Sequence, residues 1–297
     1  MQQRVFTIAE NAPVARETYR LRLTGDTAAI TAPGQFADIR LAGRFLRRPV
    51  SVCSWSDGAL TLYYKVAGAG TAQLSTLAPG TELDLLVGLG NGFDTAPAGA
   101  RPLLVGGGVG ASPLYGLAQQ LVAEGRSPLA VLGFRTAAEV LLADAFCALG
   151  IPVTVVTEDG TMGARGFVTD ALPEDGTYVY ACGPMPMLQA LCSATPLDGQ
   201  LSLEALAQAF RHGGEAALLL RLADDVLQYI VHERAEQRRV EFCLLPWRGA
   251  QAVLQEKRVP AAREPVDLRR GKRDRPAVER THRLWPHGGE GIRAALR

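Results

Sequence analysis

A glycine-rich turn follows an apolar run near the middle of the chain, and its residue types suit the binding of a phosphate group. Leu103, Leu104 and Val105 form an apolar run, and residues 106–113 continue it with the sequence GGGVGASP. Glycines allow a tight turn and a close approach of the backbone, and the N-terminus of a following helix carries partial positive charge. The turn therefore suits a pyrophosphate, although such turns also serve ordinary packing between a strand and a helix.

A second pair of segments with phosphate chemistry lies earlier in the chain. Residues 47–51 read RRPVS, and an arginine is a natural bidentate partner for phosphate while a serine adds a hydrogen bond. Residues 68–71 read GAGT and offer backbone N–H groups that a second phosphate could approach. Each segment alone is a common surface feature. Together, and in this order, they favour a site for a flavin dinucleotide.

A fourth candidate segment is the CGPM sequence at residues 182–185, which follows an apolar run at 178–181. In parallel sheets, ligands bind at the carboxyl ends of the strands. A nucleophilic role for Cys182 would need a neighbouring base, and the sequence shows no candidate. We therefore expect this turn to line a nicotinamide pocket, the alternative being that Cys182 is a small buried residue at a turn. No catalytic side chain and no metal ligand is predicted.

The elements that must position these segments change in type near residue 98. Before it, short alternating runs at 18–23, 36–41 and 59–66 are separated by Gly, Pro and Asp, which is typical of a small antiparallel barrel. After it, strands at 103–105, 129–133, 153–156 and 178–181 alternate with helical segments, among them 137–149 and one opened by Pro184, which indicates a parallel α/β sheet. No acidic residue stands at the end of the second of these strands, which argues against an ordinary Rossmann dehydrogenase.

The composition limits the possible partners and compartment. The 297 residues are 47% hydrophobic with a formal net charge of +1, and the five cysteines have neither disulfide-like nor zinc-like spacing. The N-terminus has no apolar signal segment and no window approaches a membrane span, so we expect a cytoplasmic protein with no membrane partner. Arginines gather toward the end of the chain, but without aromatic interleaving or a nucleic-acid motif we expect no nucleic-acid partner.

Taken together, these segments resemble the ferredoxin-reductase superfamily and, within it, the electron-transfer subunit of type B dihydroorotate dehydrogenase. The resemblance spans residues 1 to about 204. It is carried by the motifs PGQF (33–36), RPVS (48–51), GT (70–71), GNGF (90–93), GGGVG (106–110), TEDG (157–160), GFVTD (166–170), CGPM (182–185) and LSLE (201–204). One departure is VGLG at residues 87–90, where the family usually has GPLG.

The resemblance implies a fold, cofactors and a partner. It implies a Greek-key FAD barrel at residues 1–98, an NAD-binding α/β domain at 99–199 and an atypical tail at 200–297. An FMN-containing catalytic subunit would be the partner in a hetero-oligomer of pyrimidine biosynthesis, and electrons would pass through a [2Fe–2S] cluster and FAD to NAD⁺. The residues expected to hold FAD and NAD are Arg48, Pro49, Val50, Ser51, Tyr63, Tyr64, Lys65, Gly70, Thr71, Gly106, Gly107, Gly108, Val109, Gly110, Cys182, Gly183, Pro184 and Met185.

The tail departs from the resemblance after Glu204. The family continues there into a cysteine-rich segment that ligates the cluster with plant-type spacing, whereas the only later cysteine here is Cys243. Three interpretations are open: a frameshift near the codon for Glu204, a genuine replacement domain, or loss of the cluster with a retained flavin reductase. We favour the frameshift. An amphipathic helix at 216–240 and disorder beyond Pro260 are also predicted.

Two other functions remain open at this point. A freestanding NAD(P)H–flavin reductase, or a reductase subunit for another acceptor, would share the same fold and glycine motifs. A non-catalytic flavin- or nucleotide-binding module is the third possibility. The sequence does not distinguish NAD from NADP.

Overall fold

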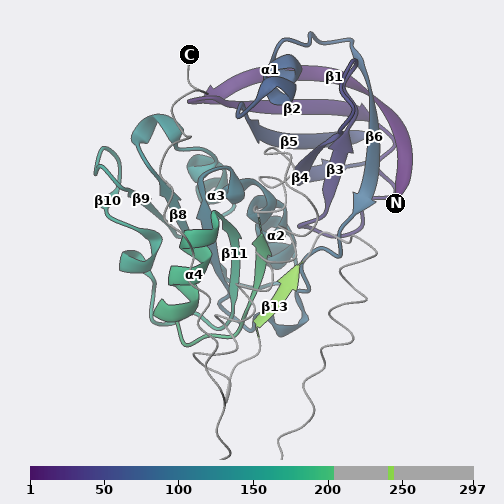
Figure 1. Ribbon diagram of the computed structural model, residues 1–297. Helices are drawn as coiled ribbons and strands as arrows, with labels where there is room; N and C mark the ends of the chain where they lie inside the picture. Colours follow the sequence, from purple (N-terminus) through teal and green to yellow (C-terminus); the bar gives the residue numbers. More distant parts are fainter. Residues whose placement is uncertain (204–239, 244–297) are drawn as a thin grey trace, which may run out of the picture. The chain divides into compact units, whose positions relative to one another are not determined.

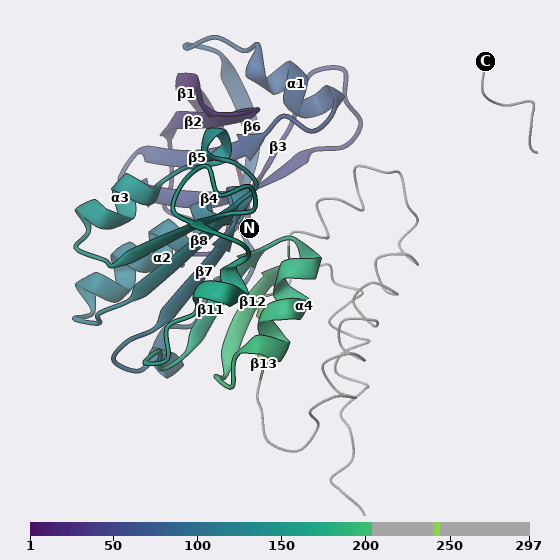
Figure 2. The same cartoon turned by 90° about the vertical axis from the view of Figure 1, so that its left-hand side faces the viewer.

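The computed structural model describes residues 1–203 and 240–243 of the chain (Figures 1 and 2). The predicted disorder beyond Pro260 lies outside the described residues, and so does the predicted helix at 216–240, apart from Val240, which begins a strand. The order of the strands and helices below therefore refers to the described part of the chain alone.

The N-terminal part is a closed antiparallel barrel with the strand order β1-β2-β5-β4-β3-β6. Its elements are β1 (Gln2–Ala15), β2 (Thr18–Gly25), β3 (Phe36–Ile39), β4 (Arg48–Ser56), β5 (Ala59–Lys65), α1 (Ala69–Ser75) and β6 (Glu82–Leu89). Apolar side chains that alternate with polar ones along the strands fill the barrel interior. In β2, for example, Leu21 and Leu23 are buried while Arg22 is exposed. The predicted barrel is thus confirmed.

The second part is a parallel sheet with the strand order β10-β9-β8-β7-β11-β12-β13. Its strands are β7 (Leu103–Gly107), β8 (Leu129–Phe134), β9 (Val153–Thr157), β10 (Ala164–Arg165), β11 (Val179–Gly183), β12 (Gly199–Leu203) and β13 (Val240–Cys243). From β7, strands β8, β9 and β10 are added on one side, whereas β11, β12 and β13 are added on the other, so the strand order reverses between β7 and β11. The carboxyl ends of these two strands therefore border the crevice where open α/β sheets bind ligands.

Helices cover both faces of this sheet (Figure 2). The helical segments are η1 (Ala96–Ala98), η2 (Gly108–Gly110), α2 (Ala111–Ala123), η3 (Ala137–Glu139), α3 (Ala143–Ala148), η4 (Val168–Ala171) and α4 (Met185–Ala194). Leu114 and Leu117 of α2 pack with Leu104 on one face, while Leu188 of α4 packs with Val105 on the other. The neighbouring residues Leu104 and Val105 serve opposite faces, which explains why β7 is apolar throughout.

The helix predicted for residues 137–149 is interrupted, so this prediction was wrong in its first half. Residues 137–139 form the short 3₁₀ segment η3, Val140 is extended, and Leu142 has a left-handed backbone with φ of 64°. The α-helix α3 begins only at Ala143. Contacts with the barrel account for the interruption. The backbone N–H of Arg16 in the barrel donates a hydrogen bond to the carbonyl of Ala138 at 2.7 Å. The Glu139 side chain pairs with Lys65 of the barrel and with Arg135 of the sheet part.

One of the three hydrophobic clusters contains residues of both the barrel and the sheet part. Cys53 and Tyr63 of the barrel belong to the same buried cluster as Leu114 and Leu117 of α2. Gly116 of α2 lies so close to β4 that a Cβ there would be 2.5 Å from the Cys53 carbonyl oxygen. Helix α2 therefore packs directly on the outer surface of β4. This contact places segments 47–51 and 68–71 of the barrel on one side of the junction and segment 106–113 of the sheet part on the other.

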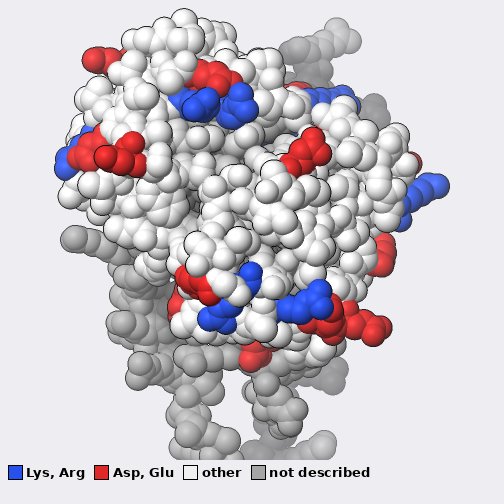
Figure 3. Space-filling view, turned by 180° about the vertical axis from the view of Figure 1, so that it is seen from behind, with Lys and Arg blue, Asp and Glu red and all other residues white. Residues whose placement is uncertain are grey.

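Some of the charged side chains on the surface lie beside opposite charges. On the face shown in Figure 3, charged side chains lie in small groups, some of mixed sign and some of one sign, between wide uncharged areas. Examples among the described residues are Arg20 with Glu10 and Arg4 with Asp26. No helix in the described part of the chain is long and apolar enough to span a membrane.

Candidate functional site

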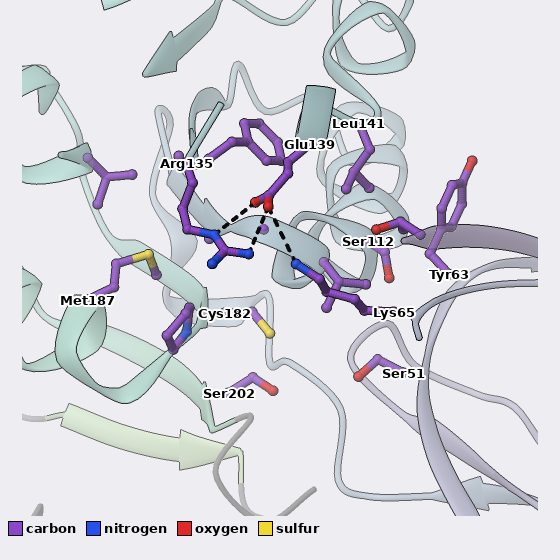
Figure 4. A pocket seen from close by; sticks show the side chains of 18 of the residues that line it. Ser51, Tyr63, Lys65, Ser112, Arg135, Glu139, Leu141, Cys182, Met187 and Ser202 are labelled. Carbon is purple, nitrogen blue, oxygen red and sulfur yellow. Dashed lines mark hydrogen bonds and ion pairs between the residues drawn. The ribbon is translucent and has the colours of Figure 1, made fainter. Parts of the chain in front are cut away.

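A cavity of about 810 Å³ lies at the junction of the barrel and the sheet (Figure 4). Its barrel wall comes from β3, β4 and β5, and its sheet wall comes from the carboxyl ends of β7, β8 and β11. The volume falls within the range of roughly 300–1,000 Å³ that is usual for ligand pockets. This cavity therefore brings the four phosphate- and nicotinamide-type segments of the sequence, at residues 47–51, 68–71, 106–113 and 182–185, to one place.

Arg48 begins strand β4 and lines the barrel wall of the cavity. Its guanidinium donates to the carbonyl oxygens of Leu46 at 2.7 Å and Arg47 at 3.1 Å, which orients the side chain. A Cβ at Gly70 would overlap this guanidinium, so the glycine is required for Arg48 to lie where it does. Thr71 fixes the loop beside it, because its Oγ1 accepts hydrogen bonds from the backbone N–H groups of Ala67 and Gly68.

Tyr63, Tyr64 and Lys65 at the end of β5 also line the barrel wall. Tyr64 stacks on Tyr19 with ring centroids 5.6 Å apart, and its hydroxyl donates to Oδ1 of Asn11 at 2.9 Å. Burial raises the pKa values of both Tyr63 and Tyr64, so their hydroxyls stay protonated as hydrogen-bond donors. The two tyrosines thus form a rigid and neutral wall.

The glycine turn on the sheet side is packed so tightly that side chains are excluded at several positions. A Cβ at Gly110 would overlap the carbonyl oxygen of Cys182, and one at Gly106 would lie 2.9 Å from the Cα of Ala111. At Gly107 a Cβ would come within 2.9 Å of Pro184 Cδ. The turns that follow β7 and β11 can therefore touch only because they carry glycines, and this contact forms the floor of the cavity.

Cys182 lies in this floor with 5% of its surface exposed, in register with Gly106 of β7 and Ser202 of β12. Cys53, the other buried cysteine of the described residues, lies in β4, where burial raises its pKa far above the ordinary value. A thiol held in that way is an inert packing group.

At the edge of the cavity lies a group of three charged side chains, Glu139, Arg135 and Lys65, whose meeting the sequence did not predict. Glu139 of η3 has only 10% of its side chain exposed, and its Oε1 lies 2.8 Å from Arg135 Nη2 and 3.6 Å from Lys65 Nζ (Figure 4). Burial alone would raise the pKa of this carboxyl, but the hydrogen bond from Arg135 and the charge of Lys65 hold it below the ordinary value. Glu139 is therefore an anion that links the sheet to the barrel.

The structure brings most of the predicted site residues to the cavity surface. Those that line it are Arg48, Pro49, Val50, Ser51, Tyr63, Tyr64, Lys65, Thr71, Gly107, Gly108, Val109, Cys182 and Pro184. Those that do not are Gly70, Gly106, Gly110, Gly183 and Met185. Of the second group, Gly70 and Gly110 lie directly behind the lining and leave room for Arg48 and for the Cys182 carbonyl.

Several residues that line the cavity were missed by the sequence analysis. They are Thr18, Gly34, Phe36, Ser112, Gly133, Phe134, Arg135, Glu139, Leu141, Glu158, Gly166, Phe167, Val168, Thr169, Pro186, Met187, Ala190 and Ser202. Some of them follow the carboxyl ends of β8 and β9, and the rule that parallel sheets bind ligands at that edge could have found these. Ser112 lies within the glycine-rich stretch at residues 106–113 but was not singled out there, and nothing in the local sequence marks Glu139.

The side chains present fit two nucleotide cofactors better than a metal. Arginine, hydroxyl and tightly turned glycine backbone suit phosphates, and the apolar floor suits planar rings. Among the described residues, no group of three or more His, Cys, Asp or Glu side chains is placed to hold a metal ion. Cys53, Cys147, Cys182 and Cys192 lie in β4, α3, β11 and α4, so they offer no set of cluster ligands.

Comparison with known proteins agrees with this picture. A family model described as the oxidoreductase NAD-binding domain matches residues 104–193. A relative from Geobacillus sp. (strain WCH70) is 42% identical over 216 residues, which cover 69% of this chain and 84% of the relative. A relative from Listeria monocytogenes is 38% identical over 214 residues, with coverage of 69% and 84%. Both are named dihydroorotate dehydrogenase B (NAD(+)), electron transfer subunit.

Solved structures of reductases share the architecture. The NADH-dependent reduced ferredoxin-NADP oxidoreductase superposes with a TM-score of 0.61 at 28% identity, covering 67% of this chain and 76% of that chain. An Amycolatopsis cytochrome P450 reductase superposes with a TM-score of 0.58 at 28% identity, covering 65% of each. The predicted fold class, a barrel followed by a parallel nucleotide-binding sheet, is thereby confirmed. By its identity and coverage, the chain belongs to the family of dihydroorotate dehydrogenase B (NAD(+)) electron transfer subunits.

Proposed function

We propose that this chain passes electrons from dihydroorotate oxidation, carried out by an FMN-containing partner subunit, through FAD to NAD⁺. The observation that carries the proposal is a single cavity whose barrel wall holds the Arg48 segment and whose sheet wall holds the glycine turn after β7. Two redox cofactors bound on these walls would meet without leaving the cavity. Family membership supports the assignment of the partner reaction.

The barrel wall would hold FAD. Arg48 would bind its pyrophosphate through a charge-assisted hydrogen bond, in a position that the absence of a side chain at Gly70 makes possible. Pro49, Val50 and Ser51 continue along β4 and would support the rest of the cofactor, with the Ser51 hydroxyl as a polar contact. Tyr63, Tyr64 and Lys65 would form the neighbouring wall on β5.

The sheet wall would hold NAD. The N–H groups of Gly107, Gly108 and Val109 lie at the start of the 3₁₀ segment η2 and helix α2, where anions are stabilised. Cys182 and Pro184 would form the floor beneath the nicotinamide. The chemistry that the two cofactors supply when bound is the acceptance of electrons by FAD and their transfer as hydride to NAD⁺. The side chains bind, orient and exclude water, and none needs to act as an acid or a base.

A [2Fe–2S] cluster does not fit the cysteines of this chain. The family spacing requires a cluster of cysteines after residue 204, and only Cys243 follows that position. The cysteines of the described residues lie on separate elements. The route proposed for electrons within this chain therefore uses its flavin and nucleotide sites alone.

The proposed domains are an FAD-binding barrel at residues 1–98, an NAD-binding domain at 99–199 and a tail at 200–297. Strand β12 begins at Gly199 and continues the sheet to Leu203. A truncation after Glu204 keeps β12 and removes β13, and we expect FAD to stay bound to it. Loss of FAD from a truncation that still shows the far-ultraviolet circular dichroism of a folded barrel would contradict this division.

The function is tested by reconstitution. The full chain is loaded with FAD, mixed with an FMN-containing dihydroorotate dehydrogenase catalytic subunit, and NADH formation is followed at 340 nm with dihydroorotate as the electron donor. We expect NADH only when both subunits are present. Absence of NADH from a mixture in which both subunits carry their flavins would overturn the proposed function.

The cysteine content also favours a second candidate function. A chain of this family without cluster ligands could act as a freestanding NAD(P)H–flavin reductase or feed another acceptor. In that case the isolated chain with FAD would rapidly reduce a soluble dye with NADH as the electron donor. No NADH would form when dihydroorotate and the partner subunit are supplied. The same dye assay tests the third possibility, a non-catalytic nucleotide-binding module, because such a module would not reduce the dye.

A further inference from the structure

Ser112 carries a buried hydroxyl group that the protein itself does not use. The residue lies in the first turn of α2 with 1% of its surface exposed, and its Oγ has no hydrogen-bond partner among the described residues. A buried hydroxyl without a partner is unfavourable, because the group has lost its hydrogen bonds to water. Such an atom in a ligand cavity calls for an explanation.

Three other hydroxyl groups in helices, those of Thr71, Ser75 and Ser193, donate hydrogen bonds to backbone carbonyls of their own helix turn, and Ser112 does not. A serine or threonine within a helix commonly returns its hydroxyl to a carbonyl three or four residues earlier. Thr71 donates to Gly68 at 3.1 Å, Ser75 to Ala72 at 2.8 Å, and Ser193 to Gln189 at 3.5 Å. Ser112 makes no such bond, so its hydroxyl is left free to serve a group outside the helix.

The position of Ser112 identifies where that group would lie. Ser112 lines the same cavity as Ser51 and Tyr63 of the barrel (Figure 4). Val109 of the glycine turn lines it as well. One turn further along α2, Gly116 is in contact distance of the β4 backbone at Cys53. Ser112 therefore lies at the edge of the cavity where the barrel wall and the sheet wall meet.

We propose that Ser112 Oγ donates a hydrogen bond to an acceptor atom of a planar ring bound at this junction, and so positions that ring between the two walls. This inference rests on the proposed function, in which the barrel wall holds FAD and the sheet wall holds NAD. The acceptor is a carbonyl or ring nitrogen of the flavin, or the carboxamide oxygen of the nicotinamide. Both offer the same chemistry, and binding measurements distinguish them.

The test compares two variants that each remove one buried, unpartnered hydroxyl. Ser112→Ala removes the hydroxyl of a residue that lines the cavity. Thr136→Val is the matched control, because Thr136 Oγ1 is also buried without a partner but does not line the cavity. The dissociation constant of FAD is measured from the flavin fluorescence of the full-length chain. The dissociation constant of NAD⁺ is then measured by titration of the FAD-loaded chain.

We expect Ser112→Ala to raise one of the two dissociation constants by about 2- to 12-fold, the effect of one net hydrogen bond. A rise for FAD assigns the acceptor to the flavin, and a rise for NAD⁺ alone assigns it to the nicotinamide. Ser112→Thr, which keeps the hydroxyl, should restore binding, and Thr136→Val should change neither constant.

The inference is overturned if Ser112→Ala binds both cofactors as tightly as the parent chain does, since the hydroxyl then serves no ligand. It is likewise overturned if Thr136→Val weakens binding to the same extent, because the effect would then be a general consequence of altering the fold. A parent chain that binds no FAD would overturn the proposed function and this inference together. Unchanged constants in a parent that does bind FAD remove only the role of Ser112.

Discussion

Lys65 Nζ on strand β5 of the barrel lies 3.6 Å from Glu139 Oε1, which belongs to η3 of the parallel sheet domain. The same carboxylate receives two hydrogen bonds from Arg135, at 2.8 and 3.3 Å. Only 10% of the Glu139 side chain is exposed, and of its two cationic partners Lys65, at 30% exposed, is more buried than Arg135, at 61%. One anion thus holds a cation from each of the two walls.

Removing this anion should weaken the junction. We expect Glu139→Gln to lower the free energy of unfolding by about 1–2 kcal/mol, since Lys65 and Arg135 would lose a charged partner but remain partly hydrated. In a double-mutant cycle with Lys65→Met, the coupling energy should be about 0.5–1.5 kcal/mol. Urea unfolding of the parent, the two single variants and the double variant gives the four free energies of unfolding that the cycle needs.

The control for this cycle is Glu158→Gln. Glu158 also lines the cavity, but its side chain is exposed. Its neutralisation should change stability by less than about 0.5 kcal/mol. A coupling energy of zero between Lys65 and Glu139 would show that the contact between the two walls contributes nothing to stability.

Arg48 is expected to supply the main charge for the FAD pyrophosphate. Arg48→Ala should raise the dissociation constant of FAD by roughly 10- to 150-fold, which corresponds to about 1.5–3 kcal/mol for a hydrogen bond to a charged group. Arg40→Ala is a suitable control, because Arg40 is an exposed barrel arginine outside the cavity. An unchanged affinity for FAD in Arg48→Ala would remove Arg48 from the site.

Gly70 is expected to matter only through Arg48. An added methyl group at Gly70 would occupy the space of the guanidinium, which is the flexible end of a side chain and can move away. Gly70→Ala should therefore leave the fold intact and weaken FAD binding about as much as Arg48→Ala does. The double variant should bind no more weakly than Arg48→Ala alone. Additive losses in the double variant would show that Gly70 contacts the cofactor independently.

Gly110 should be more sensitive than its neighbour Gly108. A Cβ at Gly110 would overlap the backbone of Cys182, which can move only if the ends of β7 and β11 separate. We expect Gly110→Ala to cost about 2–3 kcal/mol of stability through overpacking. Gly108→Ala meets no neighbour within 4 Å, and its φ of 56° should cost about 1–2 kcal/mol. Equal losses in urea unfolding would contradict the close contact between the two turns.

Asp38 on β3 should make stability fall as the pH rises. Burial raises the pKa of its carboxyl from an ordinary value of 3.8 to about 6, against the opposing charges of Arg47 and Arg48, and its Oδ1 has no hydrogen-bond partner within the described residues. Between about pH 4 and 6 the folded state therefore binds more protons than the unfolded state. By linkage, this residue's contribution to the free energy of unfolding decreases through that window and stays unfavourable above it.

Asp38→Asn tests this expectation. The side chain is only partly buried, so after allowance for solvent screening we expect the variant to gain about 1 kcal/mol of stability at pH 7 and little at pH 4. Urea unfolding at the two pH values measures the difference. A variant that loses stability at pH 7 would show that the Asp38 charge is stabilised by Arg47 and Arg48 rather than penalised by burial.

The sequence by itself determined the architecture and most of the segments that line the cavity. Alternation at residues 18–23 indicated a barrel strand, and the apolar run at 103–105 with its glycines indicated a buried parallel strand with a phosphate turn. These features are readable because the period of a strand and the conformational freedom of a glycine are local properties. The relatives confirm the family resemblance that these motifs indicated.

Only the tertiary structure decided how the cavity edge is built. The predicted helix at 137–149 is broken at Leu142, which lets η3 dock on the barrel and places Glu139 between Arg135 and Lys65. The free hydroxyl of Ser112 becomes visible only once α2 packs on β4. Lys65 and Glu139 are far apart in the sequence, and no local pattern encodes their meeting. The energy of such a contact depends on burial and charge that exist only after the barrel and the sheet have packed together.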